Sequence, residues 1–144
     1  MRNDITKFKE LKNDLIDNLE GLGYNDIKNL KASVGGFFGG YYSVDINFEN
    51  RNLKWRLEGA GKENYYEKRI HRKTLDNLRE GLISVDLLNW DREYINSDIL
   101  DGTQWNVIIV INDKNIELVG SNKYPEKWTI FCQLIREVSG KKFK

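Results

Sequence analysis

Residues 101–138 read DGTQWNVIIVINDKNIELVGSNKYPEKWTIFCQLIREV, and this stretch decides the fold. Two apolar segments, 103–112 and 115–120, are separated by a short Asp-Lys turn, a pattern that predicts an antiparallel hairpin. Pro125 then suits the first turn of a helix, which Gly140 ends. The apolar residues of this last segment recur in steps of three, four and three, which is the spacing of one helix face. They are Trp128, Phe131, Ile135 and Val138.

The chain upstream of this stretch predicts three or four further strands. Residues 27–34 alternate imperfectly between apolar and polar, whereas residues 41–48 alternate strictly, which is typical of a half-buried strand. The polar turn 49–52 returns the chain as a third strand, 53–58. A fourth strand is expected at about residues 64–72, where apolar residues are fewer.

Two further helices are predicted, one before and one after these strands. The first begins at Asn3 or Asp4 and ends near Leu22, because apolar residues recur there in steps of three and four. Thr74 is expected to cap the second helix, whose leucines share one side. Residues 86–102 are expected to form a long loop without regular structure.

Together these segments predict an α+β fold in one globular domain, residues 1–144. The order is helix, three or four strands, helix, two strands, helix. Because the connecting turns are short, we expect a mostly antiparallel sheet of five or six strands packed against three helices. Trp55, Trp105 and Trp128 fall at apolar positions and are expected in the core.

The composition is that of an ordinary globular protein. The chain has 144 residues, with 23 basic and 22 acidic side chains and a net charge of +1, so no global attraction to nucleic acid or anionic membrane is expected. A single cysteine, Cys132, excludes an internal disulfide and reads as a small core residue. The sequence predicts neither a signal peptide nor a membrane-spanning helix, and a cytoplasmic location is therefore expected.

Several blocks of the sequence resemble those of a group of small uncharacterised bacterial proteins of the Firmicute type. The blocks are Gly-Gly-Phe-Phe-Gly-Gly-Tyr-Tyr (35–42), Leu-Leu-Asn-Trp (87–90), Asp-Gly-Thr-Gln-Trp (101–105) and Gly-Ser-Asn-Lys-Tyr-Pro-Glu-Lys-Trp (120–128). The resemblance covers roughly residues 33–135. That group has no assigned activity, so the resemblance implies a fold and assigns no site residue.

The glycine cluster 35–40 is the first candidate site. It lacks the Gly-Lys-Ser/Thr of a phosphate-binding loop and leads into a strand rather than a helix, so a hairpin turn is the better interpretation. Phe37 and Phe38 either lie exposed as a partner-binding surface or tuck over the end of the sheet. The aromatic residues considered for partner binding are Phe37, Phe38, Tyr41, Trp90 and Tyr94. For Trp90 the alternative, which we favour, is that it anchors its loop to the core.

Two charged segments give alternative sites. A dense basic run could contact phosphates. Alternation along a strand would divide its charges between two faces, so a charged strand edge is the favoured interpretation. The run consists of Lys68, Arg69, His71, Arg72 and Lys73. The acidic loop 91–101 could hold a cation or work in acid–base catalysis, but it lacks the spacing of a calcium loop. Its acidic residues are Asp91, Glu93, Asp98 and Asp101.

No catalytic set emerges from these residues, because the one histidine, His71, and the one cysteine belong to no recognisable dyad or metal motif. We therefore expect no cofactor, and the first hypothesis is a non-enzymatic module that binds a partner protein. Inhibitor, immunity and phage anti-defence (anti-CRISPR-like) proteins are its analogues. A nucleic-acid-binding protein using residues 68–73 is the first alternative. A small-ligand or metal-binding enzyme using residues 91–101 is the second.

Overall fold

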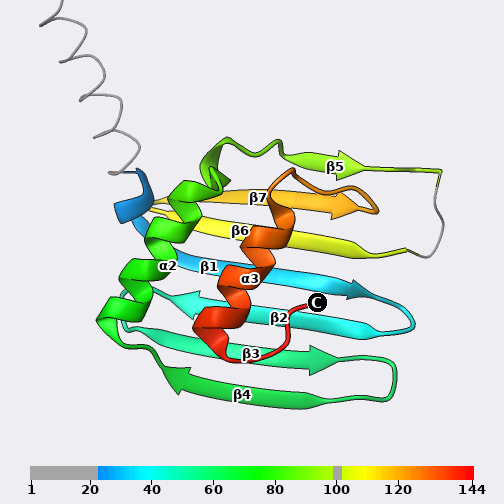
Figure 1. Ribbon diagram of the computed structural model, residues 1–144, viewed down its shortest axis with the longest axis horizontal. Coiled ribbons are helices and arrows are strands. Elements are labelled where there is room, and N and C mark those ends of the chain that lie inside the picture. The colour runs from blue at the N-terminus through cyan, green and yellow to red at the C-terminus, as the bar shows by residue number, and fades with distance from the viewer. Residues whose placement is uncertain (1–22, 99–101) are drawn as a thin grey trace, which may run out of the picture.

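The computed structural model describes residues 23–98 and 102–144. In these residues seven strands form one sheet, in the order β4-β3-β2-β1-β6-β7-β5 (Figure 1). The strands are β1 (Ile27–Gly36), β2 (Gly40–Asn47), β3 (Asn52–Glu58), β4 (Asn64–Arg69), β5 (Glu93–Ile95), β6 (Gln104–Ile111) and β7 (Lys114–Ser121). The helices are α2 (Arg72–Ser84), the 3-10 turn η1 (Leu87–Asn89) and α3 (Trp128–Ser139). The predicted N-terminal helix lies outside the described residues.

Strand β1 joins two antiparallel units into the sheet. On one side the chain runs as the meander β1-β2-β3-β4, and on the other side β1 pairs with β6 of the β6-β7 hairpin. These pairings confirm the α+β class. The predicted count of five or six strands was too low, because residues 93–95 form a short strand that pairs with β7 in parallel and makes the sheet mixed. The segment 86–102 is therefore not a loop without regular structure, as the sequence had suggested.

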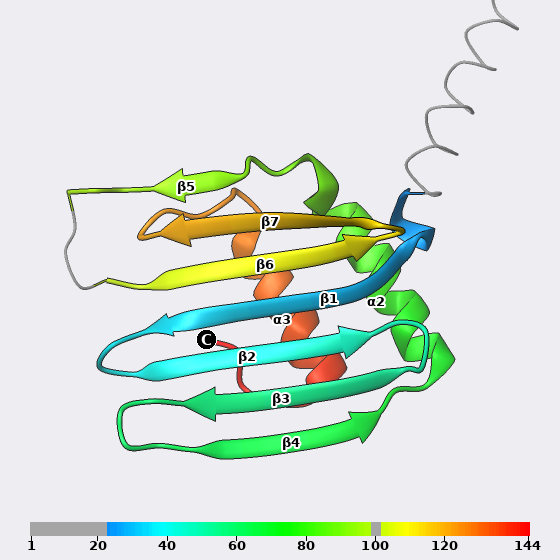
Figure 2. The same cartoon turned by 180° about the vertical axis from the view of Figure 1, so that it is seen from behind.

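Helices α2 and α3 cover the same face of the sheet, and the other face has no helix over it in the described structure (Figures 1 and 2). Alternation explains this asymmetry, because every second residue over most of the central strands is aliphatic or aromatic and turns toward the helices. Fully buried examples are Leu30, Val34, Ile46, Leu53 and Ile109. The leucines of α2 and the apolar stripe of α3 complete this core.

An aromatic cluster lies between the sheet and α3. The indole of Trp105 packs against that of Trp128 with ring centroids 4.5 Å apart, and Tyr94 and Trp90 lie 5.8 and 6.3 Å from Trp105. The Trp90 indole also donates a hydrogen bond to the carbonyl oxygen of Val85, 2.8 Å away. Trp90 thus anchors residues 86–95 to the core, as the favoured interpretation of the sequence had it.

Residues 102–105, the described part of one sequence block, contact the block 120–128 in the structure. Asn122 has a positive φ of 56°, and its side-chain Oδ1 accepts a hydrogen bond of 2.8 Å from the backbone N–H of Thr103. A Cβ on Gly102 would collide with this amide, so the position requires glycine. The Trp105 indole donates to the carbonyl oxygen of Lys123 at 2.9 Å. Packing between the start of β6 and the end of β7 therefore explains the described residues of both blocks.

The C-terminal residues are part of the fold, although their composition suggests only a basic tail. Phe143 is fully buried, and the Trp55 indole donates to the carbonyl oxygen of Lys142 at 2.8 Å. The ammonium of Lys141 lies 4.3 Å from the ring centroid of Tyr66, a cation–π distance. The tail therefore closes the helix-covered face over β3 and β4.

The helix ends differ in part from the predictions. Helix α2 begins at Arg72 after His71, which makes no side-chain capping bond, so the predicted Thr74 cap is wrong. Pro125 precedes α3 by a turn in which the Trp128 N–H donates to the Pro125 carbonyl, rather than lying in the helix. Gly140 ends α3 with a φ of 69°, which confirms the predicted C-terminal glycine.

Cys132 is buried on α3, as predicted for a small core residue, and burial raises the pKa of its thiol to about 11. At pH 7.5 the reactive thiolate is then about 300-fold scarcer than for an exposed cysteine of pKa ~8.5. Labelling of the native protein by a disulfide reagent should be at least ~100-fold slower than labelling in denaturant. Because the pKa is raised, the native rate should climb as the pH rises toward 11. Fast native labelling at pH 7.5 would contradict this burial.

Candidate functional site: the open sheet face and the β1–β2 turn

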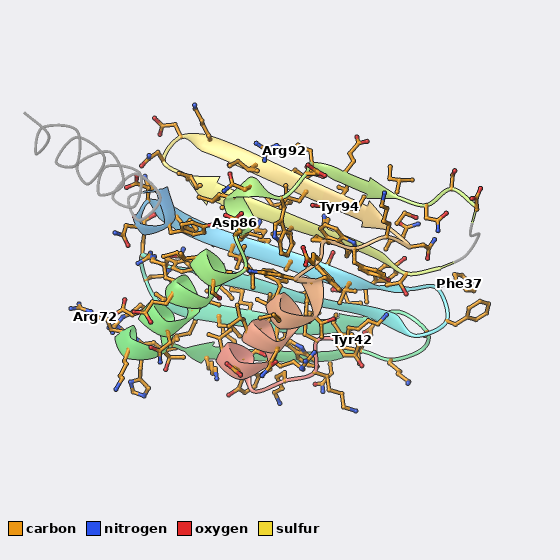
Figure 3. All side chains as sticks on the ribbon, turned by 45° about the horizontal axis from the view of Figure 1, so that its top comes forward. Phe37, Tyr42, Arg72, Asp86, Arg92 and Tyr94 are labelled. Carbon is orange, nitrogen blue, oxygen red and sulfur yellow. The ribbon has the colours of Figure 1, made fainter. Side chains whose placement is uncertain are left out.

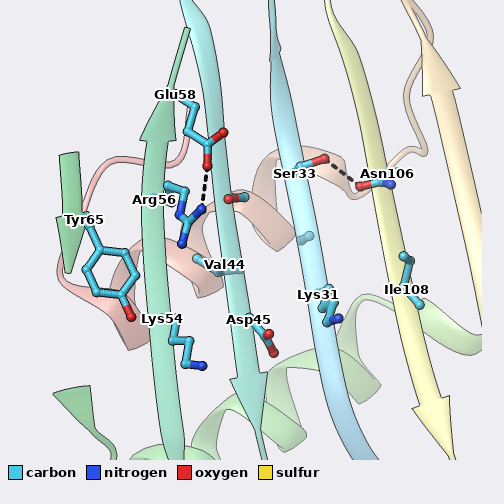
Figure 4. A pocket seen from close by; sticks show the side chains of 12 residues that line it. Lys31, Ser33, Val44, Asp45, Lys54, Arg56, Glu58, Tyr65, Asn106 and Ile108 are labelled. Carbon is cyan, nitrogen blue, oxygen red and sulfur yellow. Dashed lines mark hydrogen bonds and ion pairs between the residues drawn. The ribbon is translucent and has the colours of Figure 1, made fainter. Parts of the chain in front are cut away.

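The face of the sheet opposite the helices carries a depression of about 330 Å³ over β1, β2, β3 and β6, lined mostly by polar and charged residues (Figure 4). Ser33 and Ser43 are cross-strand neighbours, and their short side chains form its floor. The longer side chains of Lys54, Arg56 and Tyr65 form its walls. The depression therefore exists because short side chains lie beside long ones, and the backbone of the sheet beneath it is unbroken.

The charges of this depression are mixed. Lys31, Asp45 and Lys54 are successive cross-strand neighbours, so acid and base alternate across β1, β2 and β3. Arg56 forms an ion pair of 2.9 Å with Glu58, and both side chains are more than half exposed, so the pair adds little stability. The alternation gives the surface a pattern that a partner with complementary charges can recognise.

Hydrogen bonds fix several of these polar side chains. The Ser33 hydroxyl donates to Oδ1 of Asn106 on β6 at 2.6 Å. The Tyr65 hydroxyl donates to Glu67 at 2.8 Å, a bond that raises the pKa of Tyr65 and lowers the pKa of Glu67. Nothing in these bonds activates a nucleophile or a base, because each neutral donor meets an amide or a carboxylate already in its usual charge state.

A second depression of about 350 Å³ continues from the first toward β5. Ser33 and Asn106 line both depressions, and the second also contains Tyr41, Ile95 and Val119. Ile95 is 55% exposed on the edge strand β5. The two depressions thus share residues on the open face, with charged side chains over β2 and β3 in the first and the apolar Ile95 and Val119 of β5 and β7 in the second.

The β1–β2 turn holds the most exposed apolar side chains described in the structure. Phe37 and Phe38 are 77% and 80% exposed, and their rings meet edge to face with centroids 5.2 Å apart. Figure 3 shows Phe37 pointing away from the body of the protein. Gly40 adopts a φ of 80°, and a Cβ there would lie 2.8 Å from the Glu58 carbonyl oxygen, so glycine is required beside these rings. The two phenylalanines lie outside the core.

The structure brings together only part of the aromatic set considered for partner binding. Phe37, Phe38 and Tyr41 lie on one turn and the strand that leaves it, and Tyr41, 42% exposed, faces the open side. Trp90 and Tyr94 lie on the helix-covered side and pack against Trp105. Parallel pairing of β5 with β7 places Tyr94 opposite Gly120 and turns its ring toward the core, which explains the separation.

The basic run is divided between a strand and a helix. Lys68 and Arg69 end β4 on opposite faces, whereas His71, Arg72 and Lys73 are exposed at the start of α2. No ion pair involves these five side chains in the described part of the chain. Cations at a helix N-terminus add to the positive end of its dipole. This basic corner lies at the opposite end of the sheet from Phe37, as the position of Arg72 shows (Figure 3).

The described residues of the acidic loop do not converge. The Asp91 N–H donates to the Tyr94 hydroxyl, and the Asp98 N–H donates to Oδ1 of Asn96, so both bonds shape turns. Glu93 is exposed on β5, and Asp101 lies outside the described residues. Across residues 23–98 and 102–144 no three His, Cys, Asp or Glu side chains are grouped so that they could hold a metal ion.

Sequence reasoning missed the open face as a site. Its residues are the polar positions of the same alternating pattern that identified the strands. Those polar positions were the feature of the sequence that could have pointed to this face. Ser33 and Asn106 lie 73 positions apart, and only the β1–β6 pairing brings them together.

No known protein family model matches this chain, and a search of curated proteins finds no significant match. Within the described residues no helix is long and apolar enough to cross a membrane.

Proposed function

We propose that this protein is a cytoplasmic, non-enzymatic module that binds a partner protein through Phe37, Phe38 and the adjoining open sheet face. The observation that carries the proposal is the exposure of two adjacent phenylalanines on a glycine-flanked turn. Burying two such rings against a partner would yield several kcal/mol, about 25 cal/mol for each Å² of apolar area removed from water. Exposed aromatic residues of this kind are frequent energetic centres of protein interfaces.

The open face supplies the surroundings that such a centre needs. Tyr41 continues the aromatic surface from the turn onto the sheet, and the alternating charges around Asp45 can fix the partner's orientation. Small proteins that block a partner, such as immunity or anti-defence proteins, use surfaces of this type, and we propose such an inhibitory role by analogy.

The basic corner supports a second candidate, nucleic-acid binding. Three exposed basic side chains lie at the start of α2 or just before it, and none forms an ion pair in the described structure: His71, Arg72 and Lys73. Such groups bind phosphates with strong salt dependence. Affinity capture of the tagged protein from extracts of its source cells, at low and high salt, separates the two candidates. A stoichiometric protein retained at high salt supports the first, whereas nucleic acid released by salt supports the second.

The double variant Phe37→Ser/Phe38→Ser should keep its thermal midpoint within about 3 °C of wild type, because exposed substitutions change stability by less than ~0.5 kcal/mol. It should capture at least tenfold less of the partner, since truncating a central aromatic costs ~2 kcal/mol or more.

Ile130→Ser is the matched control, because Ile130 is 48% exposed on α3, on the opposite side of the sheet. It should capture the partner as wild type does. Equal losses in the control and the double variant, or no loss in either, would exclude the turn as the binding centre.

A further inference from the structure

In the described part of the chain, strand β4 forms an edge of the sheet. It pairs with β3 on one side, and within the described residues no strand pairs with its other side (Figure 2). Its six residues, Asn64–Arg69, keep an unbroken register with β3 and contain neither proline nor glycine. By contrast, the opposite edge strand β5 has three residues. A regular free edge of this length can template another strand.

The register with β3 tells which backbone groups of β4 point outward. The Ile70 N–H donates to the carbonyl oxygen of Arg51 at 2.7 Å, which continues the Asn52–Arg69 pairing by one residue. Backbone groups alternate in direction along a strand, so those of Tyr66 and Lys68 also point toward β3. The N–H and C=O groups of Tyr65, Glu67 and Arg69 therefore point to the free edge.

We infer that β4 pairs antiparallel with β4 of a second copy of this chain, around a two-fold axis at Tyr66. In this register Glu63 lies opposite Arg69 of the second copy, and Tyr65 lies opposite Glu67 of the second copy. Symmetry repeats each pairing, so two pairs of opposite charge form. The outward N–H and C=O groups of Tyr65 and Glu67 also meet those of the other strand, as an antiparallel ladder requires.

Charge selects this register over its neighbours. Directly opposed residues of antiparallel strands point to the same face of the sheet. The axis must therefore lie midway between one residue and the same residue of the second copy. An axis at Tyr65 would place Glu63 opposite Glu67, and an axis at Glu67 or Lys68 would place that residue opposite itself. Like charges directly opposite are destabilising. Among these four registers, only the axis at Tyr66 leaves no like charges opposed.

The resulting dimer would have one continuous sheet with both open faces on the same side. The two-fold axis runs perpendicular to the sheet, so the two β1–β2 turns would lie at opposite ends. This arrangement does not depend on what the turns bind. Its failure would therefore leave the proposed function untouched, and failure of the function would leave the dimer.

Sedimentation analysis of the purified full chain, at concentrations up to about 1 mM, tests the dimer. A species of twice 16.9 kDa is expected, and a monomer throughout would overturn the inference. Glu63→Arg and Arg69→Glu should each weaken dimerisation at least tenfold, because two opposite-charge pairs become like-charge pairs. The combined variant should restore it. Glu117→Arg, on β7, is the control and should dimerise as wild type does.

A disulfide tests the register directly. Tyr66 would face its own copy across the axis as a non-hydrogen-bonded pair, with Cα atoms about 4.5 Å apart, a distance that a disulfide spans. Tyr66→Cys should therefore form a covalent dimer under a mild thiol oxidant, whereas Glu67→Cys should not. The native Cys132 is buried and should not interfere. Cross-linking of Glu67→Cys instead of Tyr66→Cys would overturn this register.

Discussion

Trp105→Ala and Trp128→Ala should each lower the free energy of unfolding by about 3–5 kcal/mol, the range for truncating a buried large aromatic. Trp105 is 3% and Trp128 7% exposed, and each packs against several other aromatic rings. Trp105→Ala also leaves the carbonyl oxygen of Lys123 without its indole donor. The loss would loosen the contact between the β6–β7 hairpin and α3.

Chemical denaturation followed by far-ultraviolet circular dichroism measures this effect. We expect a lower midpoint with an unchanged slope, since the surface exposed on unfolding stays similar. Ile130→Ser, on the exposed side of α3, should unfold within ~0.5 kcal/mol of wild type. Tryptophan variants that unfold at the wild-type midpoint would show that the aromatic cluster does not hold the two layers together.

Gly120→Ala should destabilise the protein by about 3 kcal/mol, at the upper end of the cost of overpacking a core. Gly120 is buried on β7 directly opposite Trp105, and a Cβ at this position would fall on the Trp105 indole ring. Either the ring leaves its place in the aromatic cluster or the two strands move apart. Gly39→Ala is the matched control, because a Cβ on Gly39 meets no atom within 4 Å. It should cost less than ~0.5 kcal/mol.

A double-mutant cycle isolates the contact. In the Trp105→Ala background, the alanine at position 120 has room, so the second substitution should add little further destabilisation. The coupling free energy should then approach the ~3 kcal/mol that Gly120→Ala costs by itself. Strictly additive losses would mean that Gly120 is required for its backbone conformation or for another neighbour, and not for the ring of Trp105.

Partner binding and self-association use different parts of the protein surface. The β1–β2 turn exposes apolar rings with few fixed contacts, whereas the β4 edge presents charged side chains in a defined register. A charged edge opposes aggregation with unrelated strands while allowing the one register in which its charges are matched. The two proposals can therefore be tested separately with the variants described above.

The sequence by itself determined the local elements. Alternation identified β2 and β3, and less regularly β1, because a strand that is buried on one face must place apolar residues at every second position. Two apolar segments around a short turn identified the β6-β7 hairpin. Helical spacing identified the buried faces of α2 and α3. The strand Glu93–Ile95 was not predicted, because three residues are too few to show a period of two. This segment is a strand because it pairs with the edge of β7.

Only the tertiary structure decided which distant residues meet. The pairing of β1 with β6 makes neighbours of Ser33 and Asn106, and the face left uncovered by the helices becomes the candidate site. Trp90 and Phe37 are both aromatic residues among polar or glycine neighbours in the sequence, yet one lies against the core and the other in solvent. Burial depends on what a neighbouring element supplies, and local sequence carries no record of elements that approach from far along the chain.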